Sequence, residues 1–269
     1  MPPETVSLKI KRVEVLIPTM RILITNDDGI FAPGLRALLD VFVRSHEVTV
    51  VAPDRERSAI GHGITLHQPL RAEAVALDSG CRAVAVSGTP ADCIKIAVLD
   101  IMEQKPEMVI SGINPGANLG ININYSGTVA AAKEASLYGI PALAVSVQTP
   151  GSDHYDEMAR YTEALAGRVA AAGLPFGTFL NVNFPDLPIA ETAGVRVCRQ
   201  GIEMFPENIE KRMDPRNRPY YWQGCDAQTF HASPDSDGSA VAANYIAITP
   251  LKCDTTDYTL LDALGDLIA

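Results

Sequence analysis

The chain has 269 residues, and its 47% hydrophobic content is enough for a sizeable core in one large domain, or in one domain with a smaller appendage. Its 22 Lys and Arg against 32 Asp and Glu give a net charge of −10, which opposes partnership with nucleic acid or an anionic membrane. The five cysteines are scattered without a C-x-x-C pair, which fits reduced thiols in a cytoplasmic protein best. No apolar stretch approaches membrane-spanning length.

Residues 1–19 lack the apolar core of a signal peptide. Val6, Leu8 and Ile10 alternate with polar residues and are compatible with an extra edge strand. The alternative is an N-terminal extension, because Met20 and the apolar run behind it read as a natural start. We favour the extension.

From residue 20 to about residue 186, strand and helix patterns alternate. Pro33 and Pro90 suit the first position of a helix, and uninterrupted β-branched runs suit parallel strands covered on both faces. Strands are expected at 22–25, 48–52, 83–86, 108–110, 142–147 and 179–183, and helices from 33, from 90, over 126–138 and over about 154–172. This alternation predicts an α/β fold with a doubly wound, mostly parallel sheet.

After Pro185 the regular alternation of strand and helix patterns ends, and short strand patterns are separated by polar, Pro-containing stretches. Strands in hairpins are expected at 195–197, 220–222 and 245–249, and a terminal helix over 255–268. We therefore expect three parts: an extension over 1–19, a sheet domain over 20–186, and a smaller β-hairpin and helix part over 187–269 that serves oligomerisation.

The most informative motif is Asn26-Asp27-Asp28-Gly29, directly after the first expected strand. These residue types are common in turns, so a plain turn is one interpretation. The other is a metal site, because adjacent carboxylates repel each other unless a cation lies between them. Hard divalent cations take carboxylate oxygens readily, and ligands bind at the carboxyl ends of strands in open α/β sheets.

Three more polar loops, residues 54–63, 87–92 and 111–120, follow expected strands and so share that rim of the sheet. Asn114 and Asn118 in the last loop offer amide groups to a metal or a phosphate. The Ser126-Gly127-Thr128 turn opens a helix, either as an ordinary cap or as an anion site.

Other candidates on the rim are weaker. Ser87-Gly88-Thr89-Pro90 is compatible with a simple helix cap. His62 is expected to be a surface residue, and Lys95 and Lys133 to be solvated. No cysteine has a nearby base in sequence, so a catalytic thiol is not expected.

Taken together, these residues resemble the SurE family of stationary-phase survival proteins. The matching segments follow one order from about residue 20 to about residue 257: 22–29, 51–58, 86–93, 111–120, 125–128, 181–185, 214–222 and 246–251. The resemblance implies a metal-dependent phosphatase of nucleoside monophosphates, a 5′-nucleotidase that also accepts 3′-nucleotides and short polyphosphate. It further implies a Rossmann-like domain that assembles into a homodimer or homotetramer.

The resemblance also assigns the site residues. It implies one divalent ion, Mg²⁺ or Mn²⁺, whose ligands are Asp27, Asp28, Ser58 and Asn114. The phosphate is implied at Asn118, Ser126, Gly127 and Thr128. The sequence departs from the family at residues 1–19 and 233–243, and in Pro115, which follows Asn114.

The mechanism we expect is attack by a metal-oriented water, with Asp27 and Asp28 as the catalytic carboxylates and Asp27 contacting the water. A covalent aspartyl-phosphate, as in haloacid-dehalogenase-like phosphatases, is disfavoured because those enzymes separate their two carboxylates by one residue. The alternative function is a non-catalytic nucleotide-binding stress sensor, which would need no metal cluster.

Overall fold

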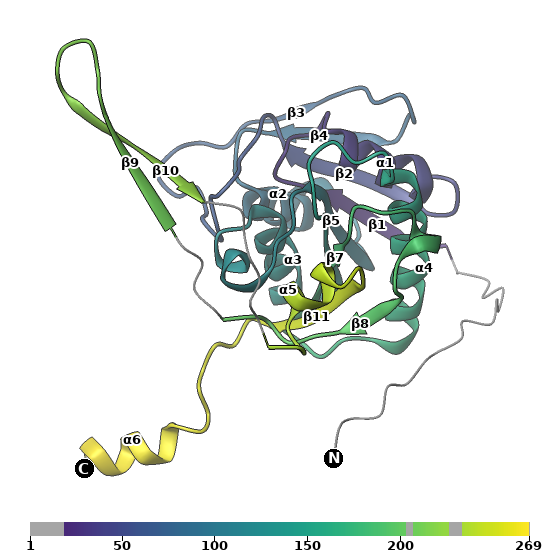
Figure 1. Cartoon of the computed structure of the whole chain (residues 1–269). Helices are drawn as coiled ribbons and strands as arrows, with labels where there is room; N and C mark the ends of the chain where they lie inside the picture. The colour runs from purple at the N-terminus through teal and green to yellow at the C-terminus, as the bar shows by residue number, and fades with distance from the viewer. Residues whose placement is uncertain (1–18, 203–206, 226–232, 269) are drawn as a thin grey trace.

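A nine-stranded sheet runs through the computed structural model, which describes residues 19–202, 207–225 and 233–268 (Figure 1). The strand order is β3-β4-β2-β1-β5-β6-β7-β11-β8. The strands are β1 (Arg21–Thr25), β2 (Glu47–Pro53), β3 (Ala72–Ala74), β4 (Arg82–Val86), β5 (Met108–Pro115), β6 (Ala142–Val147), β7 (Thr178–Phe184), β8 (Val195–Val197) and β11 (Ile246–Lys252). The alternating residues Val6, Leu8 and Ile10 lie outside the described residues.

The connections make β1 the centre of a doubly wound sheet. The chain passes from β1 outward to β2 and β4, then returns to β5 on the other side of β1 and continues to β6 and β7. Neighbouring strands are parallel except β3 with β4 and β11 with β7. The predicted fold class is confirmed, and the reversal beside β1 is the kind of switch point at which such sheets bind ligands.

Helices cover both faces of the sheet. Helices α1 (Pro33–Phe42) and α4 (Tyr155–Ala172) pack against each other on one face, and α2 (Pro90–Ile96) and α3 (Gly127–Leu137) on the other. A π-helical turn, Ala97–Ile101, continues α2, and 3₁₀ turns span Gly120–Asn124 and Ile189–Glu191. The remaining helices are α5 (Asp237–Ala242) and α6 (Leu261–Ile268).

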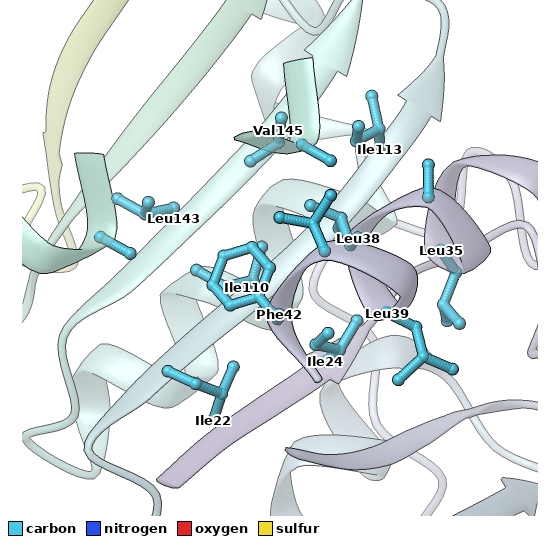
Figure 2. Close-up of a cluster of buried hydrophobic side chains, with 14 of the residues drawn as sticks. Ile22, Ile24, Leu35, Leu38, Leu39, Phe42, Ile110, Ile113, Leu143 and Val145 are labelled. Atoms are coloured by element: carbon cyan, nitrogen blue, oxygen red, sulfur yellow. The ribbon is translucent and has the colours of Figure 1, made fainter. Parts of the chain in front are cut away.

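The core explains why β1 reads as an unbroken apolar run. Ile22 and Ile24 face the α1 side, where Figure 2 shows them near Phe42, whereas Leu23 belongs to the cluster on the α2 and α3 side. The side chains of Ile22, Leu23 and Ile24 are fully buried. Helix α1 approaches β5 so closely that a Cβ at Gly34 would lie 2.0 Å from the backbone oxygen of Ile113.

The structure corrects the expected course of β5. This strand continues to Pro115 instead of ending at Ile110, with Asn114 paired to Ser146 after a register shift. The first half of the predicted loop over 111–120 is therefore strand. Its glycines and asparagines hid the strand, because pairing with β6 supports a backbone that the side chains alone do not favour.

The C-terminal strands are also arranged differently from the prediction. β8 pairs parallel with β11, and β11 pairs antiparallel with β7, so the expectation that 195–197 and 245–249 form hairpins is wrong. A separate hairpin does exist, between β9 (Glu207–Met213) and β10 (Pro219–Cys225). It extends away from the sheet, as does α6 (Figure 1).

Short or charged strands escaped the sequence patterns. β3 has three residues and β9 reads Glu-Asn-Ile-Glu-Lys-Arg-Met, neither of which alternates clearly. The terminal helix begins at Leu261 rather than at residue 255. Across the described ranges, none of the helices combines the length and apolar character that crossing a bilayer requires.

Candidate active site at the switch point

The motif after β1 is both a turn and a site. Asn26 closes the turn, since its Nδ2 donates to the backbone oxygen of Gly29 at 3.0 Å and its Oδ1 accepts from the Gly29 backbone N–H at 3.2 Å. Asn26 is fully buried and Asp27 is 5% exposed. The turn therefore fixes the two aspartates at the carboxyl end of the central strand.

The first turn of α3 lies directly against Asp27. The hydroxyl of Thr128 donates to Asp27 Oδ1, and backbone hydrogen bonds from Thr128 and Gly127 also stabilise this carboxylate. A Cβ at Gly127 would lie 2.8 Å from Asp27 Cβ and 2.9 Å from Asp27 Oδ2, so a glycine is required at this contact. The start of this helix therefore holds the Asp27 carboxyl group, and the phosphate site expected at Ser126, Gly127 and Thr128 stays a prediction.

Ser126 is the N-cap of the same helix. Its Oγ accepts from the backbone N–H of Val129 at 3.1 Å, which satisfies one of the otherwise unpaired amides of the first turn. The hydroxyl hydrogen of Ser126 is then available to donate to a neighbouring acceptor. The cap interpretation of the Ser126-Gly127-Thr128 turn is confirmed, and the anion-site interpretation stays a prediction.

The two carboxylates are electrostatically crowded. Burial raises the pKa of Asp27, against the opposing effect of the Thr128 hydrogen bond. Burial, together with the nearby negative charges of Asp27 and Glu56, raises the pKa of Asp28 to about 7. Asp28 Oδ2 is buried and has no hydrogen-bond partner. A buried, unpartnered carboxylate oxygen beside a second carboxylate fits a hard divalent cation.

Ser58 and Asn114 follow or end the strands on either side of β1, namely β2 and β5. Ser58, exposed on the loop after β2, donates to Glu56 Oε1 at 2.6 Å, and Glu56 is close enough to Asp28 to affect its pKa. Asn114, half-buried at the end of β5, donates through Nδ2 to the Gly116 backbone oxygen at 2.6 Å, so its Oδ1 is the atom suited to a cation.

The donor set at this edge contains oxygen groups of several kinds. Within the part of the chain that the structure describes, no group of three or more His, Cys, Asp and Glu side chains is arranged to hold a metal ion. A cation at Asp27 and Asp28 would therefore complete its ligands from hydroxyl, amide or water oxygens, which suits Mg²⁺ or Mn²⁺ better than a softer metal.

Asn118 makes its hydrogen bonds with residues of β6 and β7. Its Nδ2 donates to Ser146 Oγ at 2.8 Å, its backbone N–H donates to Asn183 Oδ1 at 2.8 Å, and its backbone oxygen accepts from Asn181 Nδ2 at 2.8 Å. These contacts fasten the loop behind β5 to β6 and β7. The structure thus brings Asp27 to the start of α3 but turns the hydrogen-bonding groups of Asn118 into the sheet.

A charged cluster beside the site was missed by the sequence patterns. The expectation that His62 is a plain surface residue is wrong, since its Nε2 lies 2.7 Å from Glu134 Oε2. Lys95, expected to be solvated, has its Nζ 3.2 Å from Glu134 Oε1 and 3.3 Å from the hydroxyl of Tyr138. The available signal was Glu134 itself, which with Lys133 is one of two charged residues in an α3 sequence otherwise made of small and apolar residues.

Comparisons with known proteins converge on one family. The model of the family described as Survival protein SurE matches residues 22–207. A protein named 5′-nucleotidase SurE from Desulfatibacillum aliphaticivorans is 58% identical over 247 residues, which cover 92% of this chain and 98% of that protein. One of the same name from Heliobacterium modesticaldum is 47% identical over 248 residues, covering 92% and 91%. The crystal structure of a SurE protein from Aquifex aeolicus matches with a TM-score of 0.81 and 38% identity, covering 93% of this chain and all of that one (100%).

Proposed function

This chain belongs to the SurE family, and on that premise we propose that it is a metal-dependent phosphatase that hydrolyses nucleoside 5′-monophosphates. The names of its close relatives support the activity. The single observation that carries the proposal is the pair Asp27 and Asp28 at the switch point: Asp28 Oδ2 is buried and unpartnered, and Asp27 is held by the start of α3.

The chain's own residues supply most of the chemistry. A divalent ion bound at Asp27 and Asp28 supplies positive charge that polarises a phosphoryl oxygen. Thr128 and the first turn of α3 hold Asp27 in one orientation, and the hydroxyl of Ser126, whose oxygen caps the helix, would donate to a phosphoryl oxygen. The positive end of the α3 dipole stabilises negative charge as it develops there. Asp27 is the first candidate to contact the attacking water.

The test uses the whole protein and a small panel of substrates. Release of phosphate from 5′-AMP, 3′-AMP, tripolyphosphate and p-nitrophenyl phosphate is measured after EDTA treatment and again after addition of Mn²⁺ or Mg²⁺. We expect turnover of 5′-AMP to stop with EDTA and to return with metal. The other substrates decide whether the activity extends to 3′-nucleotides and polyphosphate, and the two metals decide which ion serves best.

Asp28→Asn is the matching variant, and Asp100→Asn, at an exposed aspartate after α2, is its control. We expect Asp28→Asn to reduce turnover to background while the thermal midpoint stays close to that of the control. Retained activity in Asp28→Asn refutes the site, and absence of turnover with every metal favours the nucleotide sensor.

We also propose that residues 187–269 join copies of this chain into a homodimer or homotetramer. The hairpin exposes Ile209, Tyr221 and Trp222, and Leu261 and Leu264 of α6 are about half exposed. Apolar side chains grouped on extensions of this kind are typical of association surfaces. Trp222 is the one tryptophan of the chain, so its fluorescence reports on the hairpin alone.

Association is measured by sedimentation across a dilution series, with tryptophan emission read on the same samples. We expect dissociation to shift the emission of Trp222 to longer wavelength as the side chain becomes hydrated, and Trp222→Glu to sediment as a smaller species than the wild type. A monomer at all concentrations refutes this assembly. We keep a cytoplasmic location as a proposal; it rests on the scattered cysteines, of which Cys81, Cys93, Cys198 and Cys253 are free thiols.

A further inference from the structure

A buried carboxylate lies behind the loop that carries Ser58. Glu134, in the middle of α3, is 6% exposed. Its Oε2 is 2.7 Å from His62 Nε2, and its Oε1 is 3.2 Å from Lys95 Nζ. The three groups join three separate elements: α3, α2 and the loop between β2 and β3.

Glu134 is held in its ionised form. Burial works to raise the pKa of Glu134, but hydrogen bonds from His62 and Lys95 outweigh it, and the net direction is down. A buried charge of this kind is tolerated only when its partners remain in place. Lys95 is fixed in turn by the hydroxyl of Tyr138 at 3.3 Å. The hydrogen bonds among Glu134, His62, Lys95 and Tyr138 therefore hold this part of α3 in a fixed arrangement.

The loop reaches this point just after Ser58. On one side, the backbone N–H of Arg57 donates to the backbone oxygen of Asp27 at 2.7 Å. On the other side, the Gly61 backbone N–H donates to the Tyr125 backbone oxygen at 2.8 Å, immediately before His62 meets Glu134. Residues 58–60 between these anchors are exposed.

Ser58 thus has little local packing of its own. Its position depends on the two anchors, of which the second is fastened to α3. The same helix presents Gly127 and Thr128 to Asp27 at its N-terminal end. A shift of the second anchor would move Ser58 relative to the aspartates, while the aspartates would stay with the start of α3.

We propose that Glu134 and His62 are positioning residues of the site: their hydrogen bond fixes the loop so that Ser58 stays within reach of a cation held by Asp27 and Asp28. The inference rests on the proposed function, because it assigns Ser58 to that cation. Neither residue touches the substrate in this account. Lys95 balances the charge of Glu134 and does not contact the loop.

The test combines four variants with a matched control. Glu134→Gln keeps the volume but leaves one acceptor oxygen for two donors, His62→Phe removes the hydrogen bond from the loop side, and the double variant removes both. Lys95→Met removes the charge partner alone. Glu107→Gln is the control, since Glu107 also accepts a hydrogen bond, from the Arg21 backbone N–H at 2.9 Å, but at the opposite edge of the sheet.

Three experiments are made. Hydrogen exchange over residues 57–63 of the metal-free protein reports how well the loop is ordered. Titration calorimetry gives the Mn²⁺ affinity without substrate, and steady-state kinetics give kcat and KM for 5′-AMP. We expect Glu134→Gln and His62→Phe to speed exchange in this segment and to weaken Mn²⁺ binding by about 10- to 100-fold. We expect kcat to fall and KM for 5′-AMP to change little. The double variant should be no worse than the poorer single variant, and Glu107→Gln should match the wild type.

The outcomes separate this inference from the proposed function. Unchanged exchange, or faster exchange with wild-type Mn²⁺ affinity, overturns the positioning role. A change confined to KM overturns it too, because it would mean that His62 contacts the nucleotide. An effect of Lys95→Met on Mn²⁺ affinity larger than that of His62→Phe shows that charge, not the loop, matters, and also overturns it. A wild type that binds Mn²⁺ but hydrolyses no phosphate ester refutes the proposed function alone.

Discussion

Adding one methyl group at Gly127 should damage the site without unfolding the protein. In Gly127→Ala the new Cβ would meet Asp27 Cβ at 2.8 Å, Asp27 Oδ2 at 2.9 Å and Pro90 Cγ at 3.1 Å. Ordinary contact distances begin at about 3.5 Å, so Asp27 and the helix start must separate by several tenths of an ångström. Overpacking of this size costs about 1–3 kcal/mol in the free energy of unfolding.

The effect on catalysis should be comparable with the effect on stability. A misplacement approaching 1 Å at a catalytic centre can reduce turnover by about a hundredfold, equivalent to about 2.7 kcal/mol in the activation barrier. The assay is kcat for 5′-AMP with saturating Mn²⁺, together with a urea unfolding curve. Gly265→Ala is the control, because a Cβ at that helical position meets nothing within 4 Å. A Gly127→Ala enzyme with wild-type kcat would refute the argument that this contact sets the position of Asp27.

Other consequences concern single contacts. Thr128→Val keeps the shape but removes the donor to Asp27 Oδ1, so the unfolding free energy should fall by about 1.5–3 kcal/mol in urea, and an unchanged curve would contradict the contact. Phe42→Ala empties a fully buried site in the cluster of Figure 2 and should cost about 3–5 kcal/mol by the same measurement; a loss under 1 kcal/mol would contradict close packing there. Burial lowers the pKa of His46 below 6.5, and the negative charge of Glu163 opposes this effect. The contribution of neutral His46 to stability is therefore complete above about pH 6.5. It is lost as the pH falls further, because His46 takes up a proton more readily in the unfolded chain than in the folded protein. Urea midpoints between pH 8 and 5 should show a smaller decline in His46→Gln than in the wild type, and equal declines would exclude His46 as a cause.

The parts of the fold that local sequence determines were predictable. Val48 to Ala52 is an unbroken run of β-branched and small residues, and it is a buried parallel strand of the sheet. Thr89 was proposed as a helix cap, and it forms a reciprocal capping box with Asp92. In both cases the cause lies within a few residues of the effect, where periodicity and capping chemistry operate.

The parts that depend on distant residues were not predictable in the same way. Glu134 and His62 meet although 72 positions separate them, and no local pattern relates the two. The extension of β5 to Pro115 depends on β6 as a neighbour. The contacts of Asn118 with β6 and β7 likewise depend on the assembled sheet. Sequence patterns thus placed the aspartates at the carboxyl ends of the strands. The long-range contacts that hold the surrounding loops in position could be identified only from the folded structure.

The position of β11 has a consequence for how the protein is made. β11, whose last residue is Lys252, lies between β7 and β8. On a ribosome, the strands up to β7 emerge first, and the outer edge of β7 stays unpaired until β11 follows. At usual synthesis rates of about 5–20 residues per second, this interval lasts a few seconds to about fifteen seconds.

An open strand edge is a template for pairing with another chain. On the β7 edge, Asn181 and Asn183 are fully buried in the finished protein. Nascent chains on neighbouring ribosomes are therefore most exposed to wrong pairing during this late interval. Slowing translation within residues 185–252 should lower soluble yield more than slowing it after residue 252.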